Sequence, residues 1–143
     1  MSEQAHPGSL VILVADDQAG LRRMLQEVFA EDGHTVWLAA GGQQAVALVR
    51  EHRPDVALID LKMPGMSGLD ALREIRLIAP ELPVVVMTAY GETDIVSEAY
   101  SLGARCAIPK PFDIDVVRQE VYRAAAEAQR PIAAEGRPPY GGE

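Results

Sequence analysis

Two stretches, LVILVADD at residues 10–17 and VALIDLKMPG at residues 56–65, decide the fold of this chain. Each begins as an apolar run and then changes to aspartate and turn residues. A third run, VVVMT at residues 84–88, is equally apolar. Strands of this kind are usually covered on both faces, as in a parallel sheet. With two weaker β-branched runs, we expect five strands, at residues 10–15, 35–39, 56–60, 84–88 and 105–108.

Amphipathic segments separate these runs. In the first, Leu21, Leu25 and Phe29 recur at helical spacing. Glycine and proline stand at the joints between segments. We expect helices at residues 19–31, 42–52, 68–79, 93–102 and 113–128. Five alternations of strand and helix predict an α/β fold, an open five-stranded parallel sheet with helices on both faces.

Length and composition indicate one domain. The chain has 143 residues, of which 48% are hydrophobic and 24% charged. We expect a folded domain over residues 9–128, a flexible N-terminus over residues 1–8 and a disordered tail rich in proline and glycine over residues 129–143. No apolar run is long enough for a membrane span and no signal peptide is apparent, so we expect a cytoplasmic protein.

The net charge of −8 narrows the classes of partner. Nucleic-acid binding draws its affinity mainly from clustered Lys and Arg, so a nucleic-acid partner is not expected. Anionic lipid would be repelled for the same reason. The lone Cys106 excludes an internal disulfide and a multi-cysteine metal cage. The charge favours a protein partner or a cation.

Polar side chains follow several of the expected strands. Asp16 and Asp17 follow the first, Asp60 ends the third, Thr88 ends the fourth and Lys110 follows the fifth. In open α/β folds the site lies at the carboxyl ends of the strands, so these groups should converge. Three carboxylates that close together would not stay ionised without a cation, and oxygen ligands of this kind suit Mg²⁺. With a metal bound, a carboxylate can attack phosphorus and form an acyl phosphate.

Simpler interpretations exist for each residue. Asp16 and Asp17 could cap the following helix. Thr88 could be an ordinary strand residue, and Lys110 a surface charge. The chain has 13 basic residues, and its two lysines, Lys62 and Lys110, both fall beside the expected site. This placement favours the functional interpretation, in which a compact point charge is needed.

Four segments in register, VADD, LIDLKMPGMSG, VVVMTAYG and IPKPF, resemble the receiver domain of bacterial two-component response regulators. The match covers about residues 8–127 and implies the flavodoxin-like (βα)5 receiver fold. DDQAGLRRMLQEVF, MTAYGETD and KPFDID are particularly similar to the single-domain regulators of the sporulation phosphorelay. The resemblance therefore implies two-component signal transduction by a phosphoprotein.

Residue roles follow from this resemblance. It implies that Asp60 carries the phosphoryl group as an aspartyl phosphate. Asp17 would bind Mg²⁺ directly and Asp16 through water, and Asp60 with the backbone carbonyl of Lys62 would complete the protein's ligands. The side chain of Lys62 would either cover the phosphoryl group and slow its hydrolysis, or be a solvated loop lysine.

The resemblance also implies which groups hold the phosphoryl oxygens. These are the side chains of Thr88 and Lys110 and the amide of Ala89. The Lys110–Pro111 peptide bond is expected to be cis, as in the family. One departure concerns Ala107, because the family commonly has an aromatic residue or histidine there that moves inward as the threonine engages the phosphoryl group. A methyl group cannot make this movement, so the usual aromatic switch is in doubt.

Three functions are compatible with these residues. In the first, a monomer takes a phosphoryl group from a sensor histidine kinase and relays it to a histidine phosphotransferase, with both partners contacting the first helix and the loops around Asp60 and Lys110. In the second, a stand-alone receiver binds and regulates a target, as in chemotaxis. The third, a haloacid-dehalogenase-like phosphatase, needs a second Asp at the position of Lys62. We expect self-catalysed phosphorylation without turnover of a small-molecule substrate.

Overall fold

The computed structural model describes residues 8–128, so the expected tail and all but the last residue of the expected N-terminus lie outside the described residues. Strand and helix alternate as predicted, with bounds that differ by at most one residue from those expected. The elements are β1 (Val11–Ala15), α1 (Ala19–Glu31), β2 (Thr35–Ala39), α2 (Gly42–His52), β3 (Val56–Asp60), α3 (Gly68–Ile78), β4 (Val84–Thr88), α4 (Thr93–Ser101), β5 (Cys106–Pro109) and α5 (Ile114–Ala128).

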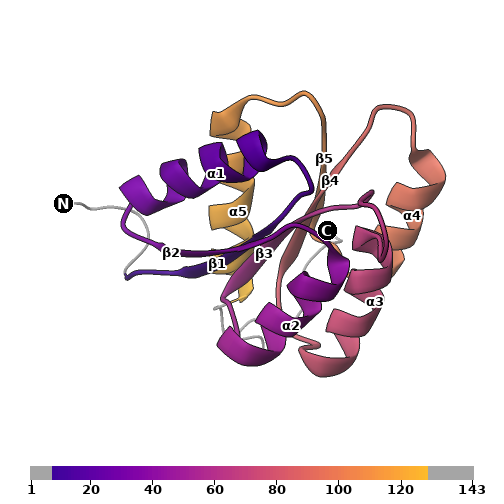
Figure 1. Cartoon of the computed structure of the whole chain (residues 1–143), viewed down its shortest axis with the longest axis horizontal. Helices are drawn as coiled ribbons and strands as arrows, with labels where there is room; N and C mark the ends of the chain where they lie inside the picture. The colour runs from indigo at the N-terminus through magenta and orange to yellow at the C-terminus, as the bar shows by residue number, and fades with distance from the viewer. Residues whose placement is uncertain (1–7, 129–143) are drawn as a thin grey trace.

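The five strands form one parallel sheet in the order β2-β1-β3-β4-β5 (Figure 1). The chain leaves β1 toward β2 on one side and returns to β3 on the other, so the switch in strand order lies between β1 and β3. This is the predicted flavodoxin-like (βα)5 arrangement. Such a switch point is where open α/β sheets form their crevice at the carboxyl ends of the strands.

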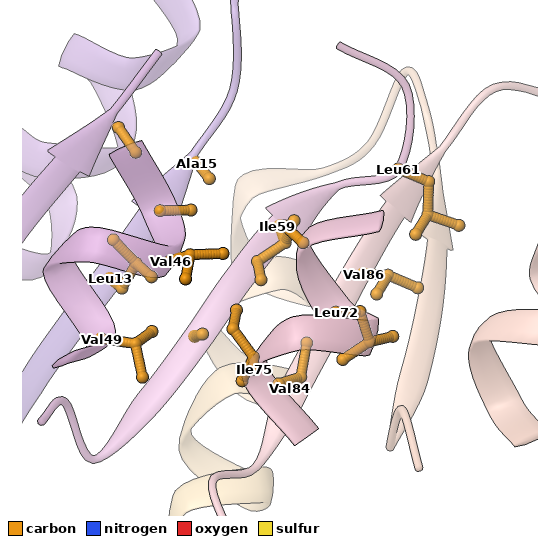
Figure 2. Close-up of a cluster of buried hydrophobic side chains, with 14 of the residues drawn as sticks. Leu13, Ala15, Val46, Val49, Ile59, Leu61, Leu72, Ile75, Val84 and Val86 are labelled. Carbon is orange, nitrogen blue, oxygen red and sulfur yellow. The ribbon is translucent and has the colours of Figure 1, made fainter. Parts of the chain in front are cut away.

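Both faces of the sheet are covered, which explains the continuous apolar runs. Successive side chains of a strand point to opposite faces. Ile12 and Val14 pack with Leu25 and Phe29 of α1 and with residues of α5. Leu13 and the alternate residues of β3 and β4 pack against α2, α3 and α4 on the other face (Figure 2). The central strands β3 and β4 are buried along their whole length, so the residues at their ends are held rigidly.

Local contacts account for the small differences at the element ends. The strand β1 begins at Val11, and the amide of the preceding Leu10 donates to Nδ1 of His34 at 2.9 Å. The helix α4 ends at Ser101, two residues before Gly103, whose φ of 91° continues no right-handed helix. Within residues 8–128, no helix combines the length and the apolar character needed to cross a membrane.

Candidate functional site

The strand ends bring three carboxylates together. β1 and β3 are neighbours, and their register pairs Ala15 with Ile59. The next residues, Asp16 and Asp60, therefore emerge side by side from the sheet. Oxygen atoms of Asp16, Asp17 and Asp60 all lie within 4.8 Å of one another. The predicted convergence is thus observed, with Asp16 and Asp60 buried and Asp17 exposed.

Lys110 joins two of these carboxylates. Its Nζ lies 2.8 Å from Oδ2 of Asp16 and 3.0 Å from Oδ2 of Asp60. The backbone of the same residue is fixed by a 2.8 Å hydrogen bond from its amide to the carbonyl of Thr88. The Lys110–Pro111 bond is cis, as expected. The ammonium group is therefore held between two acidic groups from different strands, and it is no ordinary surface charge.

The remaining oxygens of these carboxylates accept backbone hydrogen bonds. Oδ1 of Asp16 accepts from the amide of Gln18 at 2.9 Å, and Oδ1 of Asp60 accepts from the amide of Lys62 at 3.2 Å. Arg22 of α1 donates to the carbonyl of Asp16 at 2.7 Å and ties the helix to the end of β1. Helix capping does not explain the two aspartates, because Gln18 holds the N-cap position and α1 has no side-chain cap.

Burial and neighbouring charges shift the pKa values of Asp60 and Lys110. Burial raises the pKa of Asp60, the hydrogen bond and charge of Lys110 and the amide of Lys62 oppose this, and the charge of Asp16 adds to the rise. Burial alone would lower the pKa of Lys110, but the hydrogen bonds and charges of Asp16 and Asp60 outweigh it and raise that pKa. By formal charge, three carboxylates and one ammonium sum to −2. An all-oxygen site with this charge fits a divalent cation such as Mg²⁺.

A second group of side chains lies beside the first. Thr88 is buried, and its hydroxyl has two acceptors. These are Oε1 of Glu92 at 3.3 Å and the backbone carbonyl of Ala89 at 3.2 Å. Nζ of Lys62 lies 3.0 Å from Oε2 of the same glutamate. Sequence reasoning did not single out Glu92. It predicted that Lys62 either covers the phosphoryl group or is solvated, and neither prediction included an ion pair with Glu92. The signal available was its position four residues after Thr88, at the start of an expected helix.

A glycine that sequence reasoning also missed shapes the loop after β3. A Cβ atom at Gly68 would lie 1.9 Å from the carbonyl oxygen of Asp60. The amide of Gly68 donates to the carbonyl of Leu61 at 3.0 Å. The first residue of α3 therefore packs directly on the backbone of the buried aspartate, which leaves no room for a side chain. Contact with a distant backbone atom gives no signal in a single sequence.

The surroundings of Ala107 bear on the missing aromatic residue. Its amide, on the edge strand β5, donates to the hydroxyl of Tyr100 at 3.0 Å. That tyrosine belongs to α4 and is 48% exposed. An aromatic side chain thus contacts the strand at this position, but it comes from the neighbouring helix and is anchored to the backbone.

Comparison with known proteins gives three consistent results. Residues 12–122 match the family described as response regulator receiver domain. The chain is 46% identical over 112 residues to sporulation initiation phosphotransferase F of Bacillus subtilis, covering 78% of this chain and 90% of that protein. It is 42% identical over 113 residues to regulatory protein AtoC of Escherichia coli, but this match covers 79% of the chain and 24% of the relative.

Solved structures agree in fold. The receiver domain of NtrX from Brucella abortus superposes with a TM-score of 0.75 at 31% identity, covering 80% of this chain and 98% of that one. A CheY-like receiver domain protein from Methanospirillum hungatei gives a TM-score of 0.81 at 21% identity, covering 85% and 98%. The family match spans most of the chain, and the acidic cluster lies where the fold places its crevice. The chain therefore belongs to the response regulator receiver domain family.

Proposed function

We propose that this protein is a phosphorelay intermediate that accepts a phosphoryl group on Asp60 from the histidine of a sensor kinase and passes it to the histidine of a phosphotransferase. The observation that carries the proposal is the position of Asp60, held between Lys110 and the amide of Lys62 at the crevice of the sheet. Oxygen atoms of Asp16 and Asp17 lie within 4.8 Å of an Asp60 oxygen. Carboxylates grouped in this way suit a nucleophile that reacts beside a bound cation.

The chemistry requires an exchange of bonds at phosphorus. An oxygen of Asp60 attacks the phosphorus of the phosphohistidine and forms a new O–P bond. The P–N bond breaks, and its electron pair returns to the imidazole nitrogen. As charge builds on the phosphoryl oxygens, the ammonium of Lys110 and the hydroxyl of Thr88 stabilise it. Transfer to the second histidine is the reverse of these steps.

Magnesium is part of the proposal. Asp16, Asp17 and Asp60, with the carbonyl of Lys62, would hold the ion, and the charge of −2 on the cluster supports this assignment. When bound, Mg²⁺ would offset the repulsion between the acidic cluster and an incoming phosphoryl group. Lys110 pairs with two of these carboxylates, those of Asp16 and Asp60, and orients them.

Two observations favour a relay over a stand-alone regulator. The similar Bacillus protein that this chain nearly spans is named a phosphotransferase of sporulation initiation. Ala107 also lacks the aromatic side chain expected to transmit phosphorylation to a binding surface. Direct transfer of the phosphoryl group needs less conformational change than target regulation does.

The proposed partner surface surrounds the site. Tyr90, after β4, is 88% exposed, and Met24 of α1 is 42% exposed. The next residue, Leu25, is fully buried, so Met24 lies on the exposed face of the helix and Leu25 on the core face. Met24 lies on the first helix and Tyr90 lies two residues after Thr88. We assign this surface to the helices of the kinase and the phosphotransferase.

The first test is intact mass after incubation with acetyl phosphate and Mg²⁺. We expect a gain of one phosphoryl group in the wild type, but not in Asp60→Asn and not when the metal is removed with EDTA. Asp70→Asn, which alters an exposed carboxylate at the start of α3, is a matched control and should still be phosphorylated. An Asp60→Asn protein that gains the same mass would refute the assignment.

The second test separates relay from regulation. The phosphorylated protein is mixed with a histidine phosphotransferase, and the label is followed by mass. Loss from Asp60 with equal gain on the partner's histidine is expected of a relay. Retention of the label together with tighter binding to a target would instead favour the stand-alone regulator.

A further inference from the structure

Glu92 occupies a hydroxyl group, that of Thr88, which the proposed function assigns to the phosphoryl group. Its carboxylate accepts a hydrogen bond from the hydroxyl of Thr88 through one oxygen and pairs with Lys62 through the other, at 3.3 Å and 3.0 Å. The pKa of Glu92 is lowered, first by its hydrogen bond with Lys62, and also by those from Thr88 and from the backbone of Ala89. An anionic group of the protein itself therefore holds one of the donors that a phosphoryl group would need, the hydroxyl of Thr88.

The two anions cannot use these donors together. A threonine hydroxyl has one proton, and that of Thr88 is already shared between Glu92 and the carbonyl of Ala89. When Thr88 donates to the phosphoryl group, its hydrogen bond to Glu92 must break. A hydroxyl shared with the phosphoryl group would also bring the carboxylate near a second negative charge, and nearby like charges repel. If Asp60 is phosphorylated as proposed, the side chain of Glu92 would therefore be displaced.

Displacement of Glu92 would change the contacts at the N-terminus of α4. Glu92 holds the N-cap position of this helix, and its carbonyl accepts from the amide of Val96 at 3.1 Å. Its side chain makes no capping hydrogen bond, because it reaches back to Thr88 and Lys62 instead. The preceding residue, Gly91, has a φ of 88°, which permits this reversal. A released carboxylate can move to the helix N-terminus, where negative charge is favourable.

We propose that Glu92 is an internal latch, an autoinhibitory carboxylate that holds Thr88 and Lys62 in the unphosphorylated protein and transmits phosphorylation to α4 when it is released. The inference rests on the proposed function, because it requires a phosphoryl group on Asp60. It supplies a route from the site to a surface helix that does not depend on an aromatic residue at Ala107. The reacting atoms do not touch Glu92, so it is a positioning residue.

The first test compares phosphorylation rates of Glu92→Gln and Glu98→Gln with acetyl phosphate and Mg²⁺. Glu98 is the matched control, because it lies on α4 itself and pairs with a cation, Arg73, on a neighbouring helix. Removing the latch charge should raise the rate about 3- to 10-fold, whereas Glu98→Gln should stay within about 2-fold of the wild type. An equal or lower rate in Glu92→Gln would overturn the latch.

The second test measures the conformation around the start of α4 by NMR and does not depend on the phosphorylation rate. Amide resonances of residues 91–96 are recorded for the wild type with and without beryllofluoride, a mimic of the phosphoryl group, and for Glu92→Gln without it. We expect the variant's resonances to shift from the free wild type toward the beryllofluoride complex. Resonances that stay at the free wild-type positions would overturn the latch. A wild type that neither binds beryllofluoride nor gains phosphoryl would overturn the proposed function itself.

Discussion

The two lysines beside Asp60 belong to two different clusters. The inner cluster, Asp16, Asp60 and Lys110, has side chains that are 0%, 8% and 23% exposed. In the outer cluster, Thr88, Glu92 and Lys62, the lysine is 64% exposed and the glutamate 19%. Their closest ion-pair distances are similar, 2.8 Å and 3.0 Å. The same type of contact therefore occurs in a buried and in a largely hydrated setting.

The setting decides what each contact contributes. A charge left alone after loss of its buried partner is strongly destabilising, because water does not replace that partner. An exposed pair contributes about 0–1 kcal/mol, since water competes for both groups. The inner cluster is therefore suited to fixed charge placement, and the outer cluster to an interaction that breaks and re-forms.

The largest expected effect is that of Lys110→Met on stability. In metal-free buffer, the free energy of unfolding should fall by about 3 kcal/mol, because Asp16 and Asp60 lose their counter-charge. Urea denaturation with EDTA present measures the change. Arg105→Met is the matched control: Arg105 pairs at 3.0 Å with Glu127, and both side chains retain access to solvent. Its loss should stay below about 1 kcal/mol, and equal losses in the two variants would contradict the comparison.

An intermediate effect is expected for Asp60→Asn as a function of pH. Burial raises the folded-state pKa of Asp60 above its ordinary value of 3.8. The neutral form is thus favoured in the fold, and its contribution to stability is complete below that value and lost as pH rises through the raised pKa. At about pH 7 the asparagine variant should be more stable than the wild type by about 1 kcal/mol in metal-free buffer.

The same variant gives a second measurement with magnesium. The stability advantage of Asp60→Asn should shrink as pH falls toward the ordinary carboxyl value. Excess Mg²⁺ should stabilise the wild type by about 2.7 kcal/mol at 100 times its dissociation constant, and the variant by less. Urea denaturation at several pH values, with and without the metal, follows both effects. A wild-type advantage at neutral pH without metal would show that Asp60 is stabilising as an anion.

The smallest expected effect is that of Lys62→Gln. Because its ammonium is hydrated, the free energy of unfolding should change by less than about 1 kcal/mol. The same urea denaturation measures it. A loss as large as that of Lys110→Met would mean that the outer cluster is as rigid as the inner one, and the distinction between them would fail.

Sequence patterns were sufficient for the elements and for the inner cluster. Continuous apolar runs located the strands and helical spacing located the helices, each to within a residue. The runs are continuous because a parallel sheet is buried on both faces. Asp16, Asp60 and Lys110 could be placed together because parallel strands end at the same edge of the sheet. Their roles in phosphoryl transfer stay predictions until Asp60 is tested.

Tertiary structure alone decided the partners of the side chains beyond the strand ends. Glu92 contacts Lys62 because the loops after β3 and β4 approach each other, and Gly68 is required because α3 begins against the backbone of Asp60. Hydrophobic periodicity is a property of one segment and survives in the sequence. Which loops meet depends on how the segments pack against one another. The distance between two loops therefore cannot be derived from the sequence of either loop alone.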